Sequence, residues 1–275
     1  MLVKRILTAL VGIPLSVLVV VQGGWLFVAA VTALTLCAWH EWRGICSAAA
    51  IEIPQMAGGA FLLLLLGCAW QGNGRELYAI TSFAALAVMS LAVLGRARYS
   101  LQTAAFTCLG ALYIGAGFSH LVLLRFLSGA VNVELFGSFV AAGAVYLGIA
   151  FLGIWSSDTM AFFVGRQWGR HKLSPSISPG KTVEGFIGGL LCCVALTIYL
   201  GQVWLGLSAF SAAGLGVLIG LTAPLGDLAE SALKRFAGVK DSGTLFPGHG
   251  GVLDRFDSVL FAVPVVYYYI QAVAG

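Results

Sequence analysis

Charged residues are scarce in this chain of 275 residues. Asp, Glu, Lys and Arg make up 9% of it, whereas soluble domains carry about a quarter. Hydrophobic residues make up 60%, and the mean hydropathy is +0.97. So little charge excludes a soluble globular protein, and the composition predicts an integral membrane protein.

Cysteine spacings typical of disulfide frameworks and zinc sites are absent as well. The six cysteines lie in or beside apolar runs and form no CxxC pair, so we expect them to be small core residues.

The sequence shows no internal repeat, no low-complexity segment and no soluble domain. A small-residue cleavage site does not follow the first apolar run, which we therefore expect to be retained as a span and not removed as a signal peptide.

Nine apolar runs can be placed along the chain, each near the length that crosses about 30 Å of hydrocarbon. We predict an all-α polytopic integral membrane protein with about nine transmembrane helices and two cytoplasmic polar loops. One integral membrane domain is expected over residues 1–275, with mainly scaffold spans in 1–135 and the catalytic spans and loops in 136–275. The expected spans are 6–22, 24–39, 57–71, 78–94, 103–124, 136–157, 186–203, 209–226 and 258–273.

Lysine and arginine are distributed unevenly between the two ends of these runs, and such residues concentrate in cytoplasmic loops. With the N-terminus inside, thirteen of the fifteen basic residues are cytoplasmic, and only Arg75 and Arg125 lie outside. This bias supports an odd number of spans and places the polar loops 158–185 and 227–257 in the cytoplasm. The net charge of +4 would attract anionic lipid head groups and nucleotides there. Nothing in the sequence implies binding to nucleic acid.

Residues 226–257 hold five of the eleven acidic residues and four of the basic ones. Ionisable groups beside membrane spans are costly and mark a functional site by default. If the preceding helix continues past Gly226, four polar residues at spacing i, i+3, i+4 and i+7 share one face. Such a face can hold a hard divalent cation and the anion bound to it; the alternative is a solvated helix end with intrahelical ion pairs. The four residues are Asp227, Glu230, Ser231 and Lys234.

A second pair of carboxylates follows in the same loop, in the segment LDRFDS. Asp254 and Asp257, together with Asp227, offer the oxygen ligands that Mg²⁺ prefers, and substrate phosphates can complete its shell. The glycine-rich turn 246–251 allows backbone amides to approach an anion. Within it, His249 either donates to a phosphate or a leaving group, or is structural. The basic residues able to cradle a polyphosphate are Lys234, Arg235, Lys240 and Arg255.

The other polar loop follows the sixth apolar run. Asp158 lies at the end of that run, where a carboxylate needs a cationic partner such as Arg166 or Arg170, or helps to organise the site. Gly165 and Gly169 form a small-xxx-small step, which allows close packing of helices or of a nucleotide. The segment P-S-I-S-P-G-K-T is not a Walker motif, because Pro175 replaces the first glycine and no strand is expected before it. Its phosphate donors would be Ser178, Lys181 and Thr182.

A family resemblance becomes specific at residues 231–257, which read S-A-L-K-R-F-A-G-V-K-D-S-G-T-L-F-P-G-H-G-G-V-L-D-R-F-D. This run resembles the signature of the phosphatidate cytidylyltransferases, also called CDP-diacylglycerol synthases. S-x-x-K-R, K-D, P-G-H-G-G and D-R-x-D occur at matching spacing, with no departure. The upstream loop is similar to the S-P-K-K-[ST]-x-E-G element of the same family, with Gly180 where a lysine is common. The first five spans match only in hydropathy and in the A-W-H-E-W segment.

The resemblance implies a nucleotidyltransferase of phospholipid biosynthesis. It would transfer a cytidylyl group from CTP to phosphatidic acid, giving CDP-diacylglycerol and pyrophosphate. The implied cofactor is Mg²⁺ or Mn²⁺, with room for a second, monovalent or divalent, cation. A homodimer among the lipids of a bacterial cytoplasmic (inner) membrane is also implied, with the site facing the cytoplasm.

Residue roles follow from the matched motifs together with the pattern of charges. Asp227 and Asp254 match the carboxylates that bind the metal in the family, and Asp257 joins them by its spacing. The expected catalytic residues are Asp227, Lys234, His249, Asp254 and Arg255. The expected substrate-binding residues are Asp158, Ser178, Lys181, Thr182, Ser231, Arg235, Lys240 and Asp241.

Two other functions are weighed against this one. A lipid kinase with CTP or ATP as donor would need a base for an alcohol, and Asp227 or Asp254 could serve. A transporter of anionic solutes would place charges near the bilayer midplane and often shows inverted repeats, whereas here the charges lie at one face.

Two further patterns have simpler interpretations. His40-Glu41 lacks the second histidine of a zinc protease. Trp39, Trp42 and Trp168 are typical of anchors at the membrane interface.

Overall fold

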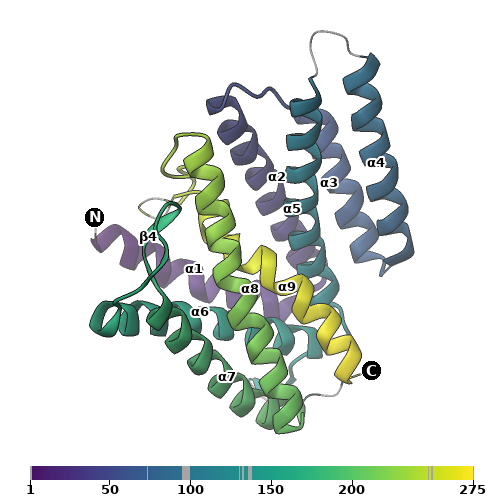
Figure 1. The fold of residues 1–275 in the computed structure, drawn as a ribbon. Helices are drawn as coiled ribbons and strands as arrows, with labels where there is room; N and C mark the ends of the chain where they lie inside the picture. The colour runs from purple at the N-terminus through teal and green to yellow at the C-terminus, as the bar shows by residue number, and fades with distance from the viewer. Residues whose placement is uncertain are drawn as a thin grey trace. The chain divides into compact units, whose positions relative to one another are not determined.

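The structure, a computed structural model, describes residues 2–72, 74–94, 100–129, 131, 133–135, 138–246, 248 and 250–274. They contain nine α-helices and two short antiparallel hairpins (Figure 1). The helices are α1 (Leu2–Gln22), α2 (Gly24–Ala48), α3 (Gln55–Trp70), α4 (Gly74–Leu94), α5 (Leu101–Arg125), α6 (Ala142–Trp168), α7 (Val183–Leu205), α8 (Ala209–Phe236) and α9 (Leu253–Ala274). The strands are β1 (Glu134–Leu135), β2 (Ser138–Phe139), β3 (Lys172–Ser174) and β4 (Ser178–Thr182).

Long apolar helices confirm the predicted class of helical membrane protein. Six of the described helices are long and apolar enough to cross a membrane, namely α2, α5, α6, α7, α8 and α9. Helices α1, α3 and α4 contain shorter apolar stretches. Each expected span overlaps a helix, while the count of nine spans stays a prediction.

The polar loops are shorter and more ordered than their sequences suggest. Helix α6 continues to Trp168, so Asp158 lies inside the helix and not at its end. Helix α8 passes Gly226 and ends at Phe236, which is the condition for the predicted polar face. No strand is expected before the segment P-S-I-S-P-G-K-T, but in the structure this segment follows β3 and contains β4. A short antiparallel hairpin of this kind leaves little hydrophobic signal, and this explains why the sequence does not reveal it.

Two compact units make up the chain. Unit 1 comprises residues 1–123 and 233–256, and unit 2 comprises residues 124–232 and 257–275. The segment 233–256, which holds the glycine-rich turn, therefore belongs with the N-terminal helices. Residues that the sequence marks as scaffold can thus contribute to the surroundings of this turn. A single integral domain stays a prediction.

The core of unit 1 is built on two tryptophans of α2. Trp39 and Trp42 are each 2% exposed, and their indole N–H groups donate to Gln55 O at 3.0 Å and Phe106 O at 3.1 Å. The interpretation of both as interface anchors is therefore wrong: each indole N–H finds a backbone acceptor inside the unit, so neither ring needs water. Trp168, in unit 2, is exposed.

In unit 2, helices α6 and α7 approach each other at glycines. A Cβ on Gly185 would lie 2.6 Å from Ala161 O, and a Cβ on Gly189 would lie 2.6 Å from Ser157 O. On α6, Gly165 is close to the Gly185 backbone, since its own Cβ would lie 3.5 Å from Gly185 Cα. The small-xxx-small step at Gly165 therefore serves close packing of helices.

Gly58→Ala should destabilise unit 1, because a methyl group there would overlap the buried ring of Trp39. Overpacking of this kind costs about 1–3 kcal/mol. The measurement is the thermal midpoint in detergent, followed by a thiol-reactive dye in a background where the buried Cys46 is the single cysteine. The matched control is Gly59→Ala on the same helix, whose Cβ would meet Leu36 and Trp39 only at 3.9 Å. Equal midpoints for both variants would contradict the tight fit.

Candidate active site

In unit 2, a cation and a carboxylate pair between the β3–β4 hairpin and α8. Lys181 Nζ lies 2.7 Å from Asp227 Oδ2, with side chains 26% and 35% exposed. The hydroxyl of Ser231, one turn further along α8, donates to Asp227 Oδ1 at 3.2 Å. Asp158 on α6 lies near enough to Asp227 and Lys181 to be affected by both charges, and Lys181 is the cation of the two, where the sequence suggested Arg166 or Arg170. Four predicted residues therefore form one partly exposed polar set, called here the Asp227 set.

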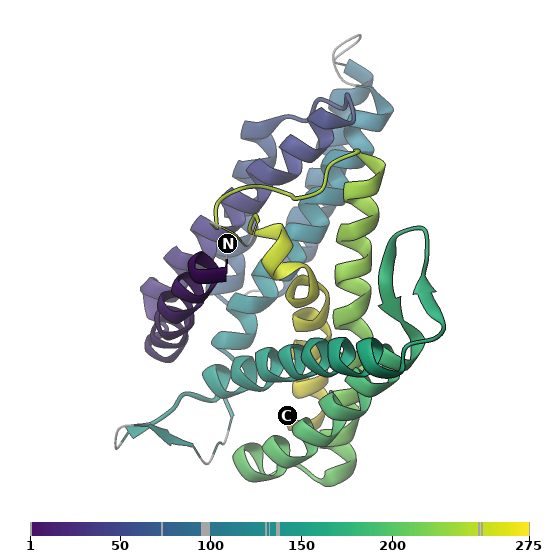
Figure 2. The ribbon, with the colours of Figure 1, turned by 90° about the vertical axis from the view of Figure 1, so that its left-hand side faces the viewer.

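The hairpin that carries Lys181 is fastened to the start of α7. Glu184, in the first turn of α7, accepts hydrogen bonds from the backbone N–H groups of Arg170 at 3.1 Å and His171 at 3.2 Å. Thr182 caps α7, because its hydroxyl accepts from Gly185 N–H at 3.1 Å and satisfies a free donor of the first turn. Figure 2 shows the resulting hairpin as a narrow two-stranded loop. The hairpin that carries Lys181 is therefore held at both ends, by Glu184 at the start of β3 and by the Thr182 cap at the end of β4.

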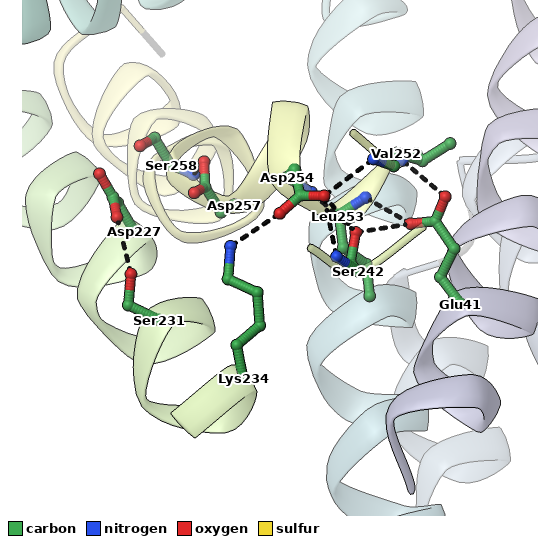
Figure 3. Close-up of polar contacts among 11 residues, drawn as sticks. Glu41, Asp227, Ser231, Lys234, Ser242, Val252, Leu253, Asp254, Asp257 and Ser258 are labelled. Atoms are coloured by element: carbon green, nitrogen blue, oxygen red, sulfur yellow. Dashed lines mark hydrogen bonds and ion pairs between the residues drawn. The ribbon is translucent and has the colours of Figure 1, made fainter. Parts of the chain in front are cut away.

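In unit 1, the carboxylate of Asp254 is fully engaged. Its Oδ1 lies 2.7 Å from Lys234 Nζ. Its Oδ2 accepts from Ser242 N at 2.9 Å, Ser242 Oγ at 2.9 Å and Gly251 N at 2.8 Å. The Asp254 side chain is only 6% exposed and that of Lys234 16%. The Asp254 set, the name used here for Lys234, Ser242 and Asp254, is a compensated and largely buried cluster (Figure 3).

Backbone amides at the end of the glycine-rich turn and just after it donate to the chain's own carboxylates, and their approach to a substrate anion stays a prediction. Gly251 N–H donates to Asp254, while Val252 N–H and Leu253 N–H donate to Glu41 at 2.8 and 2.9 Å. Gly250 has a φ of +84°, a conformation that residues with a side chain rarely adopt. A Cβ there would also lie 2.5 Å from Asp254 Oδ2. His249 lies outside the described residues, and its role stays a prediction.

Glu41, on α2, is the residue that sequence reasoning missed. It is 7% exposed and reaches the turn from more than 200 positions earlier in the chain. A signal was present, because Glu41 closely follows the apolar run 24–39 and a carboxylate beside a membrane span is a functional candidate by default. The A-W-H-E-W segment fails as a zinc motif, and its match to the family assigns no role to Glu41.

The other predicted residues that the structure describes are either half-buried, as Asp257 and Ser178 are, or exposed. Asp257 bonds within its own turn, since Ser258 N–H donates to its Oδ1 at 2.6 Å. It belongs to unit 2 with Asp227, and α9 touches α8 there, because a Cβ on Gly226 would overlap the Asp257 carbonyl. Ser178 is half-buried in β4. The exposed residues, all in unit 1, are Arg235, Lys240, Asp241 and Arg255.

The donor set fits a cation that is held partly by substrate. Among the residues that the structure describes, no three carboxylate, imidazole or thiol groups gather as a protein-only metal site. Asp227 fits a hard cation best, because its carboxylate is partly exposed and Mg²⁺ commonly takes one or two carboxylates plus phosphate oxygens. The Asp254 side chain is nearly buried and contacts more donors than Asp227 does, so a metal there would have to displace more of them. Which carboxylates bind a metal stays a prediction.

Comparisons with known proteins agree along the whole chain. The cytidylyltransferase family matches residues 3–273. A phosphatidate cytidylyltransferase of Staphylococcus aureus (strain COL) is 33% identical over 265 residues, which cover 95% of this chain and 96% of that protein. The phosphatidate cytidylyltransferase of Staphylococcus haemolyticus (strain JCSC1435) is 34% identical over 265 residues with the same coverage.

Gly251→Ala should destabilise unit 1, because its methyl group would overlap both Glu41 Oε2 and Ser242 Oγ. The cost of such overpacking is about 1–3 kcal/mol, measured as a lower thermal midpoint in detergent. Gly44→Ala on α2 is the control, since nothing lies within 4 Å of its Cβ. A midpoint for Gly251→Ala equal to that of the control would mean that the turn is not held as described.

Proposed function

The chain belongs to the cytidylyltransferase family, and from this premise we propose that it transfers a cytidylyl group from CTP to phosphatidic acid. The observation that carries the proposal is the similarity to phosphatidate cytidylyltransferases over 95% of the chain. The products are CDP-diacylglycerol and pyrophosphate. The protein is thus a nucleotidyltransferase of phospholipid biosynthesis embedded in a membrane.

The reaction needs charge neutralisation more than it needs a base. An oxygen of the lipid phosphate forms a bond to the α-phosphorus of CTP, and the bond from that phosphorus to the β-phosphate oxygen breaks, so that pyrophosphate leaves. The nucleophile is already an anion. The barrier therefore lies in bringing two polyanions together and in holding them in line.

Both polar sets contribute to this task in our proposal. Lys181 exchanges its contact with Asp227 for a phosphate oxygen, while Asp227 becomes available to a divalent cation. Mg²⁺ or Mn²⁺ bound there supplies Lewis-acid stabilisation of phosphate charge. Lys234 and the exposed basic residues of unit 1 hold further phosphate oxygens. The supporting observations are the partial exposure of the Lys181–Asp227 pair and the exposure of Arg235, Lys240 and Arg255.

Each polar set offers a cation to substrate phosphates, Lys181 in unit 2 and Lys234 in unit 1. Phosphatidic acid must reach them sideways from the bilayer, since extraction costs about 0.8 kcal/mol per exposed CH₂. The excess of basic residues supports a site on the cytoplasmic face of a bacterial cytoplasmic membrane. A homodimer and a second cation rest on the family resemblance alone.

The experiment that tests the function is label transfer from CTP to phosphatidic acid by purified protein. CTP labelled at the α-phosphate should yield labelled lipid, whereas CTP labelled at the γ-phosphate should not. Chelation of divalent cations should stop transfer, and added Mg²⁺ or Mn²⁺ should restore it. Labelled lipid from the γ-position would instead identify a lipid kinase, and no labelled lipid from either would refute both.

Lys181→Ala should lower kcat/KM for CTP about 10- to 100-fold, because a charge-assisted contact to phosphate is lost. Steady-state kinetics with varied CTP measure the effect. Lys172→Ala is the matched control: Lys172 lies in the same hairpin and is exposed, so its loss should change kcat/KM less than about twofold. Equal, small effects of the two variants would make the β3–β4 hairpin an ordinary connection.

A further inference from the structure

Glu41 binds three donors of one short segment. Its Oε1 accepts from Val252 N–H at 2.8 Å, and its Oε2 accepts from Leu253 N–H at 2.9 Å and from the Ser242 hydroxyl at 3.0 Å. All three donors belong to the segment that ends in the first turn of α9. A buried carboxylate is tolerated when its oxygens are satisfied in this way.

Glu41 also accepts from N–H groups at the start of α9. The first N–H groups of a helix have no partner within the helix and carry a partial positive charge. Val252 immediately precedes α9 (Leu253–Ala274), and its side chain contains no acceptor. The Glu41 carboxylate therefore satisfies the N–H groups of Val252 and Leu253, while the N–H of the next residue, Asp254, donates to the Ser242 hydroxyl.

The Ser242 hydroxyl links Glu41 to the Asp254 set. Its Oγ lies 3.0 Å from Glu41 Oε2 and 2.9 Å from Asp254 Oδ2, and it accepts from Asp254 N–H at 3.3 Å. Because a hydroxyl has one proton, it donates to one carboxylate at a time. The two carboxylates therefore share this donor (Figure 3), and Asp254 cannot move without disturbing Glu41.

Glycines fit closely on both sides of the Glu41 carboxylate. A Cβ on Gly243 would lie 2.6 Å from Glu41 Oε1, and one on Gly251 would overlap Glu41 Oε2. The carboxylate is therefore enclosed by the segment that it binds. Movement of Glu41 would require movement of the turn itself.

We propose that Glu41 is a positioning residue of the active site: through Ser242 and the first turn of α9, it fixes the Asp254 carboxylate and its Lys234 partner in one geometry. This inference rests on the proposed function. Glu41 itself touches no substrate, since it is buried beneath the turn. Loss of Glu41 should lower the rate of the chemical step, because small displacements of the reacting groups raise the barrier of that step.

Glu41→Gln tests the proposal. Glutamine keeps the shape of the side chain but replaces one acceptor oxygen with an NH₂ group, which faces an N–H whichever way the amide is turned. We expect kcat per folded molecule to fall about 10- to 100-fold, with the KM values for CTP and phosphatidic acid changed less than about threefold. The measurement is transfer of α-label from CTP to phosphatidic acid, with the folded fraction determined by size-exclusion chromatography.

Glu52→Gln is the matched control, because it makes the same substitution at an exposed position of unit 1. Its kcat and KM should equal those of the unmodified protein. A kcat for folded Glu41→Gln within about twofold of the control would overturn the proposal and leave Glu41 a purely structural residue. Absence of label transfer by the unmodified protein would instead refute the proposed function.

Ser242→Ala keeps the proposal testable if Glu41→Gln fails to fold. It removes the shared hydroxyl but retains the backbone N–H that donates to Asp254 at 2.9 Å. We expect a lower kcat of about 3- to 10-fold with unchanged KM. If both variants fold, the double variant should lose no more than the worse single one, because both act through Asp254. Unchanged kcat in Ser242→Ala, or additive losses in the double variant, would contradict the link.

Discussion

A carboxylate beside a membrane span has to be compensated where it lies, and this constraint organises both units of the protein. Leaving a buried ionised group unpaired costs several kcal/mol, roughly the net stability of a domain. Asp254 meets the requirement with Lys234, Ser242 and backbone amides. Asp227 meets it with Lys181 and Ser231. The polar residues therefore occur as compensated sets and not as isolated ligands.

The two sets differ in the solvent exposure of their side chains, and this difference suits them to different roles. The Asp254 set is largely buried and bound to a rigid turn, which favours a constant geometry. The Lys181–Asp227 pair is partly exposed and joins a hairpin to a helix, and in the proposed reaction it exchanges partners with substrate phosphates and a cation. Such an exchange creates no net unpaired charge at the membrane surface. Fixed and exchangeable groups are both needed to bring two polyanions into line.

Local patterns in the sequence predict the helices and the polar face of α8, because hydropathy and helical spacing are properties of neighbouring residues. They also predict that Lys181 and Asp227 belong to the site, although not that they pair. Local patterns do not reveal that Trp39 and Trp42 are buried, since this depends on acceptors in α3 and α5. The role of Glu41 is hidden for the same reason. Its partners lie 201 to 212 positions away, and no short-range spacing encodes such contacts.

The long separation between Glu41 and its donors has a consequence for biosynthesis. Translation proceeds at about 5–20 residues per second, so roughly 10 to 40 s pass between the synthesis of Glu41 and that of Val252 and Leu253. During this interval the insertion machinery has to hold α2 while the Glu41 carboxylate still lacks the donors that it has in the folded protein. Synthesis of residues 242–253 then supplies the missing donors. The resulting hydrogen bonds join α2 to the start of α9. A nascent chain released before residue 252 would lack this closure.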